Sequence, residues 1–195
     1  MVIIAVVGTS GSGKTTTIEY LISHLTKEGL KIGSIKHIHR PDFPIDTVGK
    51  DTWRYTNAGA AVTMAIAPKE IAIIKQLKKP FDSLDQITSL LEKEELDVIF
   101  IEGFKSLVVQ RKDILKIITS KNPTDLREML NETSPPILAI SGPVAKRKIQ
   151  RHEFETPIID MPDNGDLLLN IVKNHITRKN ETVKRQANGR HRRPL

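Results

Sequence analysis

The sequence contains no cysteine and few aromatic residues, and both scarcities limit what the protein can be. Without cysteine, disulfides, thiolate metal ligands and cysteine nucleophiles are excluded. Because aromatic residues make up only 4% of the 195 residues, we expect a core built mainly from Ile, Leu and Val. No apolar run reaches the ~20 residues of a membrane-spanning helix, and the N-terminal apolar run is too short and lacks the basic flank of a signal peptide. We therefore expect a cytoplasmic protein that does not interact with membranes.

The net charge of +7 is concentrated at one end of the chain. Residues 178–195 hold seven Lys or Arg residues and one Glu, so the rest of the chain is nearly neutral. This segment also lacks the aromatic residues that stack on bases in single-stranded nucleic acid sites. We predict one domain over residues 1–177 followed by a basic, disordered tail over 178–195. An arm that binds nucleic acid is the alternative interpretation of the tail.

A glycine-rich segment, Gly8–Thr15, follows the apolar run Val2–Val7 and has the spacing G-x-x-x-x-G-K-[ST]. This spacing is typical of a phosphate-binding loop between a strand and a helix, here expected over residues 15–28. The glycines bring successive N–H groups onto one anion, and the start of the helix adds its positive dipole end. Lys14 is expected to reach the β and γ phosphates of a nucleotide, and Thr15 to bind Mg²⁺. The candidate phosphate contacts are Gly8, Thr9, Ser10, Gly11, Ser12, Gly13, Lys14 and Thr15.

Basic and acidic residues gather at the end of a second predicted strand, residues 31–37. Strand alternation puts His37 and His39 on one side, near the carboxyl end of a parallel strand, where such sheets bind ligands. We predict that both histidines contact an anion, and that Asp46 or Asp51 contacts Mg²⁺ or its waters. A solvated loop is the alternative for the histidines, since two histidines without a third ligand make a poor metal site.

A second acidic element follows the apolar run Val98–Ile101, which is typical of a buried central strand. Glu102 ends this run, so we expect it beside the phosphate-binding loop, where it would hold Mg²⁺ through water or orient an attacking water. Asp97 begins the same strand about 16 Å away and is assigned to capping or to solvent. Lys14 and Glu102 are therefore the candidate catalytic residues, and the candidate Mg²⁺ ligands are Thr15, Glu102 and Asp46.

The remaining segments complete an α/β pattern. We expect helices over 51–58, 83–94, 124–130 and 163–177, an antiparallel strand pair over 61–67 and 70–77, and strands over 114–118, 136–141 and 157–161. The predicted fold is an α/β P-loop NTPase, a three-layer α/β/α arrangement with a mostly parallel central sheet and an antiparallel strand pair at one edge. The motif Asn-Lys-x-Asp, whose Asp pairs with guanine, is absent. Ser141 and Gly142 are expected either to contact the base or to form a plain turn.

Taken in order, several segments give the chain a resemblance to a known family. The chain resembles the MobB family, the adaptor proteins of molybdopterin-guanine dinucleotide biosynthesis. Five segments carry this resemblance: the phosphate-binding loop, Lys36-His37-x-His39, Gly49-Lys50-Asp51, Ala58-Gly59-Ala60 and Glu102-Gly103-Phe104-Lys105. The resemblance covers roughly residues 1–175. It implies three further nucleotide contacts: Thr16 in the phosphate motif, Lys50 after the second strand, and Lys105 in the second acidic motif.

The resemblance also implies a function. It implies a GTP-binding protein with Mg²⁺ as cofactor and at most slow GTP hydrolysis, which acts mainly as an adaptor, with molybdopterin or its guanine dinucleotide as a candidate ligand. The implied partners are a molybdenum cofactor guanylyltransferase and other cofactor-maturation proteins, and the implied assembly is a homodimer. Two alternatives stay open. One is a P-loop kinase of a small molecule, and the other is a metallochaperone GTPase, which the lack of cysteine and of a histidine-rich tract disfavours.

Overall fold

The computed structural model describes the placement of all 195 residues except 41, 148–153 and 190–195, and of residues 180–189 it describes the backbone. Contacts between residues divide the chain into two compact units. The first comprises Met1–His37 and Ser83–Leu195, and the second comprises Ile38–Asp82. The single domain predicted over 1–177 thus contains a second compact unit.

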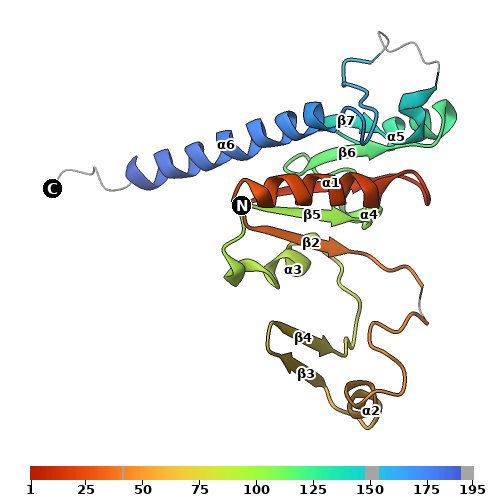
Figure 1. The fold of residues 1–195 in the computed structure, drawn as a ribbon, viewed down its shortest axis with the longest axis vertical. Helices are drawn as coiled ribbons and strands as arrows, with labels where there is room; N and C mark the ends of the chain where they lie inside the picture. The colour runs from red at the N-terminus through yellow and green to blue at the C-terminus, as the bar shows by residue number, and fades with distance from the viewer. Residues whose placement is uncertain (41, 148–153, 190–195) are drawn as a thin grey trace. The chain divides into compact units, whose positions relative to one another are not determined.

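The first unit is built on a parallel sheet of five strands, in the order β2-β5-β1-β6-β7 (Figure 1). The strands are β1 (Val2–Val7), β2 (Ile32–Lys36), β5 (Val98–Glu102), β6 (Leu115–Thr119) and β7 (Ile137–Ser141). β5 lies between β2 and β1, and residues 98–101 are fully buried, as predicted for a central strand. The parallel registers align Glu102 with Val6 of β1 and with Lys36 of β2, so three strand ends meet at Glu102.

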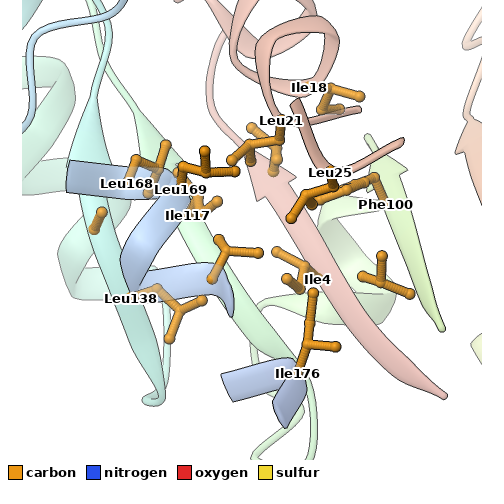
Figure 2. Packing of buried hydrophobic residues seen from close by; sticks show 14 of the residues in the cluster. Ile4, Ile18, Leu21, Leu25, Phe100, Ile117, Leu138, Leu168, Leu169 and Ile176 are labelled. Atoms are coloured by element: carbon orange, nitrogen blue, oxygen red, sulfur yellow. The ribbon is translucent and has the colours of Figure 1, made fainter. Parts of the chain in front are cut away.

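Helices α1 (Lys14–Lys27) and α6 (Gly165–Gly189) pack on the same face of the sheet. Figure 2 shows this core, in which leucines of the two helices, including Leu21 and Leu168, surround Ile4, Phe100 and Ile117 of the strands. Alternate strand residues point to the opposite face and are buried there as well. The other short helices of this unit are α3 (Leu84–Ser89), η1 (Glu92–Glu94), α4 (Lys105–Val108), α5 (Pro123–Glu132) and η2 (Pro143–Lys146). A mostly parallel sheet with flanking helices confirms the predicted fold class.

The C-terminal helix differs from the prediction, because α6 continues to Gly189 where a disordered tail was expected from residue 178. Residues 178–188 contain neither Pro nor Gly, and seven of the eleven are Lys, Arg, Glu, Gln or Ala, which favour helix, so the charged run can extend the helix. Residues 190–195 of the predicted tail lie outside the described residues. The strand predicted over 157–161 is reduced to a single parallel bridge between Ile140 and Ile158. No helix among the described residues has both the length and the apolar character needed to cross a membrane.

The second unit contains α2 (Asp51–Asn57), β3 (Val62–Ala67) and β4 (Glu70–Lys75). β3 and β4 pair antiparallel, as predicted, but they form a two-stranded sheet of their own instead of an edge of the parallel sheet. The two-residue connection after Ala67 explains the pairing of β3 with β4, because this length is typical of a tight hairpin turn. A hydrogen bond of 3.1 Å between the hydroxyls of Thr56 and Thr63 ties α2 to β3.

Candidate functional site

The loop between β1 and α1, residues 8–15, is called the phosphate loop below, and its backbone requires glycine for two different reasons. Gly13 precedes α1 with φ of 95°, in the left-handed region that L side chains rarely adopt. A Cβ on Gly8 would lie 2.1 Å from the carbonyl oxygen of Thr119, so this glycine allows the loop to pack on β6. Thr17 N–H donates to Gly13 O at 3.0 Å. The N–H groups before it, at the start of α1, face the loop and are suited to an anion.

Lys14 folds back over the phosphate loop. Its Nζ donates to Gly8 O at 3.1 Å and to Thr9 O at 2.8 Å. Burial lowers the pKa of Lys14 below that of an ordinary lysine, and the nearby carboxylate of Glu102 opposes this shift. The loop thus holds a half-buried cation whose present partners are carbonyl oxygens, which phosphate oxygens could replace at the same position.

Glu102 lies at the centre of a group of three side chains at the end of the sheet. The Thr15 hydroxyl donates to both carboxylate oxygens of Glu102, at 3.2 and 3.1 Å. Lys36 Nζ donates to the same two oxygens, each at 3.2 Å. The structure therefore brings together Thr15 and Glu102, two of the three predicted Mg²⁺ ligands. At the other end of β5, Asp97 accepts a hydrogen bond of 2.8 Å from Lys31 N–H, in the capping role expected for it.

The oxygen atoms of Thr15 and Glu102 are suited to a Mg²⁺ ion that is also bound by nucleotide phosphates. Mg²⁺ sites in such proteins use one or two protein oxygens and complete the octahedron with phosphate oxygens and waters. The Thr15 hydroxyl and the Glu102 carboxylate provide such oxygens next to a cradle for phosphates. Within the described residues, no three acidic or histidine side chains group together as a self-sufficient metal site.

Two contacts that the sequence did not predict fix the phosphate loop to β6 and α5. The hydroxyls of Ser12 and Thr119 share a hydrogen bond of 2.7 Å. On the other side, the Thr9 hydroxyl donates to Asp125 at 3.1 Å, and Asp125 also accepts from Lys121 N–H at 2.8 Å. No local signal marks these partners, because Thr9 and Asp125 are 116 residues apart. Thr119 and Asp125 therefore hold the phosphate loop in place.

Two other predicted nucleotide contacts, His37 and Lys105, interact with neighbouring residues of the first unit. His37 N–H donates to Glu102 O at 2.8 Å, and its ring stacks on Phe104 with centroids 4.1 Å apart and planes 11° apart. A Cβ on Gly103 would lie 2.8 Å from His37 Cβ, so the glycine lets the backbone after β5 approach His37 closely. Lys105 forms an ion pair with Glu132 of α5. Nucleotide contacts by His37 and Lys105 stay predictions.

The remaining predicted residues of this group, His39, Asp46 and Lys50, belong to the second unit. His39 is exposed, Asp46 accepts a hydrogen bond of 2.7 Å from Thr47 N–H, and Lys50 directly precedes α2. Their contacts to nucleotide or metal stay predictions.

A pocket of about 260 Å³ adjoins the phosphate loop within the first unit. Its lining residues come from the loop end, the turn after β7 and the segment before α6: Gly13, Thr16, Thr17, Gly142, Pro143, Lys146, Asp160 and Met161. Gly142 has φ of 93°, and a Cβ on it would lie 2.3 Å from Ser12 O, so the turn is pressed against the phosphate loop. Of the two predicted base contacts, Gly142 lines this pocket. Lys146 and Asp160 had no predicted role in a nucleotide site.

The sequence matches a family model and is similar to several named proteins. The model described as Molybdopterin guanine dinucleotide synthesis protein B, MobB, matches residues 3–141. The molybdopterin-guanine dinucleotide biosynthesis adapter protein of Haemophilus influenzae is 31% identical over 139 residues, which cover 71% of this chain and 73% of that protein. The adapter protein of Escherichia coli is 34% identical over 110 residues, which cover 56% of this chain and 59% of that protein.

Two solved structures of MobB proteins have a fold similar to that of this chain. The crystal structure of Bacillus subtilis MobB superposes with a TM-score of 0.66 at 29% identity, covering 88% of this chain and 98% of that one. The structure of a MobB homolog from Bacillus stearothermophilus has the same fold, with a TM-score of 0.65 at 20% identity over 91% of this chain and 99% of that one. Since the family model matches well over half of its residues, the chain belongs to the MobB family.

Proposed function

We propose that this protein is a GTP-binding adaptor of molybdenum cofactor maturation, which assists a guanylyltransferase in attaching GMP to molybdopterin. One observation carries the proposal: a MobB-family chain assembles Lys14, Thr15 and Glu102 at one end of its parallel sheet. The relatives from Haemophilus influenzae and Escherichia coli are named as adapter proteins of molybdopterin-guanine dinucleotide biosynthesis. Molybdopterin or its guanine dinucleotide is proposed as a ligand on the same ground.

The residues of the phosphate loop have distinct roles in this proposal. The N–H groups of the loop and of Lys14 to Thr16 bind phosphate oxygens, and Lys14 Nζ neutralises the β and γ phosphates. Thr15 binds Mg²⁺ directly and Glu102 holds it directly or through water. Bound Mg²⁺ supplies charge neutralisation between the phosphates. The protein side chains thereby hold the triphosphate in one geometry.

Hydrolysis of GTP is proposed to be slow at most. Among the described residues, no hydrogen bond or ion pair of residues 8–15 involves an arginine. An arginine at the transferring phosphoryl group accounts for a factor of about 10³ to 10⁵ in rate. A loop that binds GTP without such an arginine would hold the nucleotide longer than it takes a GTPase with one to consume it, which agrees with an adaptor role, whereas Arg40 or Arg54 supplying the charge would favour faster hydrolysis.

A homodimer is proposed from the hairpin of the second unit. One face of β3 and β4, called the hairpin face, consists of large apolar side chains that are 52–73% exposed: Val62, Met64, Ile66, Ile71 and Ile73. The register places Met64 opposite Ile73 and Ile66 opposite Ile71, so these side chains form one surface. The opposite face carries Thr63, which is bonded to α2. Contiguous exposed apolar surfaces of this kind mark interfaces with other proteins.

Titration calorimetry with GTP and ATP in Mg²⁺, followed by titration of the guanylyltransferase, tests the proposal. GTP is expected to bind at least about tenfold more tightly than ATP, a difference of about 1.4 kcal/mol. The guanylyltransferase is expected to bind the GTP-loaded protein. Light scattering on the same sample is expected to give the mass of a dimer.

Equal or tighter binding of ATP would contradict the assignment of GTP. Stoichiometric transfer of the γ-phosphate to a metabolite would replace the adaptor with a kinase. A monomeric mass at the concentration used for calorimetry would exclude the dimer.

A second prediction concerns Glu102→Gln. In Mg²⁺ this variant is expected to bind GTP about tenfold more weakly, because an amide is a poorer partner for a hydrated cation than a carboxylate. In EDTA it should bind GTP as well as the unchanged protein or better, since the carboxylate repels the phosphates. Calorimetry with and without EDTA measures both effects.

A loss of GTP affinity in Mg²⁺ without a loss in EDTA separates a role in Mg²⁺ binding from a loss of folding. Asp97→Asn is the matched control, because it removes a carboxylate from the other end of the same strand and keeps an acceptor for Lys31 N–H. Both affinities of this variant should equal those of the unchanged protein. A uniform loss for Glu102→Gln in both buffers would argue against the Mg²⁺ role.

A further inference from the structure

The pocket beside the phosphate loop begins where the phosphate contacts end. Gly13 and Thr16 line it together with Thr17, while Lys14 and Thr15 point to the loop and to Glu102. A nucleotide whose phosphates occupy the loop would therefore extend its nucleoside end along Thr16 toward this pocket. Its volume of about 260 Å³ is at the lower limit of small-molecule pockets, about 300–1,000 Å³, which suits one base better than a whole nucleotide.

We propose that this pocket binds the guanine base of the nucleotide and that the Asp160 carboxylate recognises its N1–H and N2 amino groups. The assignment rests on the proposed binding of GTP. It gives Asp160 the task that the absent Asn-Lys-x-Asp motif performs elsewhere. Residues 121–125, which contain the same residue types in another order, are used to cap α5 instead, with Asn122 Oδ1 accepting from Asp125 N–H at 3.0 Å.

The fold holds Asp160 firmly at the pocket. Ile159 N–H donates to Ile140 O at 2.8 Å, which attaches this segment to β7, and the Ile159 side chain is buried. One residue later, Asp160 O accepts from Asn164 N–H at 2.8 Å at the entry to α6. These two hydrogen bonds fix the backbone at residues 159 and 160, and the Asp160 side chain is only 19% exposed. Its position is therefore set by backbone hydrogen bonds and not by a mobile surface loop.

The Asp160 carboxylate has unused acceptor capacity. Oδ1 is buried and accepts no hydrogen bond within the described part of the chain. Lys146 Nζ forms an ion pair with Oδ1 at 3.7 Å, which is too long for a hydrogen bond, and it donates a hydrogen bond to Asp163 at 3.2 Å. A buried acceptor without a donor is rare in folded proteins unless a ligand or water supplies one. The edge of guanine that carries N1–H and the N2 amino group would supply two hydrogen-bond donors to this carboxylate.

The chemistry of the purine edges makes this carboxylate selective. Guanine presents two donors side by side, N1–H and the N2 amino group, which a carboxylate can accept together. Adenine presents an unprotonated N1 at the same place, whose lone pair a carboxylate repels. The walls of the pocket suit the flat faces of a base, because Pro143, Met161 and the aliphatic stem of Lys146 are among its lining residues. Asp160 thereby provides specificity, and the walls provide contact area.

The test is the nucleotide preference of Asp160→Asn, measured by calorimetry with GTP and xanthosine triphosphate in Mg²⁺. Xanthine has a carbonyl in place of the N2 amino group, so it complements the amide of the variant. Binding of GTP is expected to weaken about tenfold to a hundredfold, as for loss of a bidentate base contact, and xanthosine triphosphate to become the preferred ligand. A gain of binding cannot come from misfolding.

Asp163→Asn is the matched control, because Asp163 bonds the same lysine but does not line the pocket, and its side chain is 64% exposed. It should leave the preference for GTP within about twofold. Inosine triphosphate, which lacks the N2 amino group, should bind the unchanged protein about tenfold more weakly than GTP, and this measurement needs no variant. Equal binding of inosine and guanosine triphosphates, or an unchanged preference in Asp160→Asn while GTP still binds, overturns the role of Asp160 and leaves the proposed function intact. A chain that binds no GTP at all overturns both.

Discussion

Replacing Lys14 with alanine is expected to lower the affinity for GTP in Mg²⁺ about a hundredfold. Lys14 Nζ lies over the phosphate loop, where two carbonyl oxygens accept its hydrogen bonds in the absence of phosphate. Each hydrogen bond to a charged partner contributes about 1.5–3 kcal/mol, and the lower end of this range for two bonds to the β and γ phosphates, about 3 kcal/mol, corresponds to a factor of about a hundred. Calorimetry on Lys14→Ala measures the loss directly.

Lys27→Ala is the matched control for this variant. Lys27 is the last residue of α1, is exposed, and carries the same charge at the opposite end of the same helix. Its removal changes the net charge equally, so it separates a contact at the loop from a general electrostatic effect. We expect unchanged GTP affinity for Lys27→Ala. If both variants lose affinity equally, Lys14 does not contact the phosphates.

The part of the candidate site that the sequence predicted is the part encoded by short segments. The strand, loop and helix around residues 2–28 follow one another directly, and the glycine spacing specifies the loop conformation. Glu102 was predicted beside the loop because the apolar run before it is typical of a buried central strand, which was expected next to the strand that precedes the loop, and β5 does pair with β1. Both inferences rest on short segments of sequence.

The parts that were missed depend on contacts between distant segments. Asp125 is bonded to Thr9 across 116 residues, and Asp160 faces a pocket whose other walls lie near residues 13–17 and 142–146. Nothing near Asp160 in the sequence distinguishes it from an ordinary turn aspartate. The C-terminus differs for a local reason, because a basic tail was predicted from residue 178 and the structure continues α6 to Gly189 through residues that favour helix.

The hairpin is a third case in which local and global structure differ. The alternation over 61–77 predicted the antiparallel pairing of β3 with β4 correctly. It could not indicate that the pair forms a separate sheet, because strand alternation specifies two faces and not the neighbours at the edges. The exposed hairpin face is the physical consequence, since its apolar side chains are left uncovered by the described residues of this unit.

Phe100→Ala is expected to destabilise the first unit by about 3–5 kcal/mol. Phe100 is fully buried in β5, paired with Ile4 on one side and Ser34 on the other, and its ring belongs to the cluster with Leu21 and Leu25 of α1 (Figure 2). Alanine leaves a cavity between strand and helix that close packing prevents from collapsing completely. Urea unfolding at 25 °C measures the loss, which is a large share of the about 5–15 kcal/mol that stabilises a typical domain.

Leu167→Ala separates this effect from the removal of apolar atoms in general, because Leu167 lies on α6 of the same unit but is 59% exposed. Its cost should stay within about 0.5 kcal/mol. Glu102 ends the strand that holds Phe100, so GTP bound at the proposed site would stabilise the folded state that contains this core. Saturating Mg²⁺ and GTP, at about a hundred times the dissociation constant, should therefore return about 2.7 kcal/mol to Phe100→Ala. Stabilisation of the unchanged protein by GTP without any rescue of Phe100→Ala would mean that the site forms independently of this core, contrary to the register that joins them.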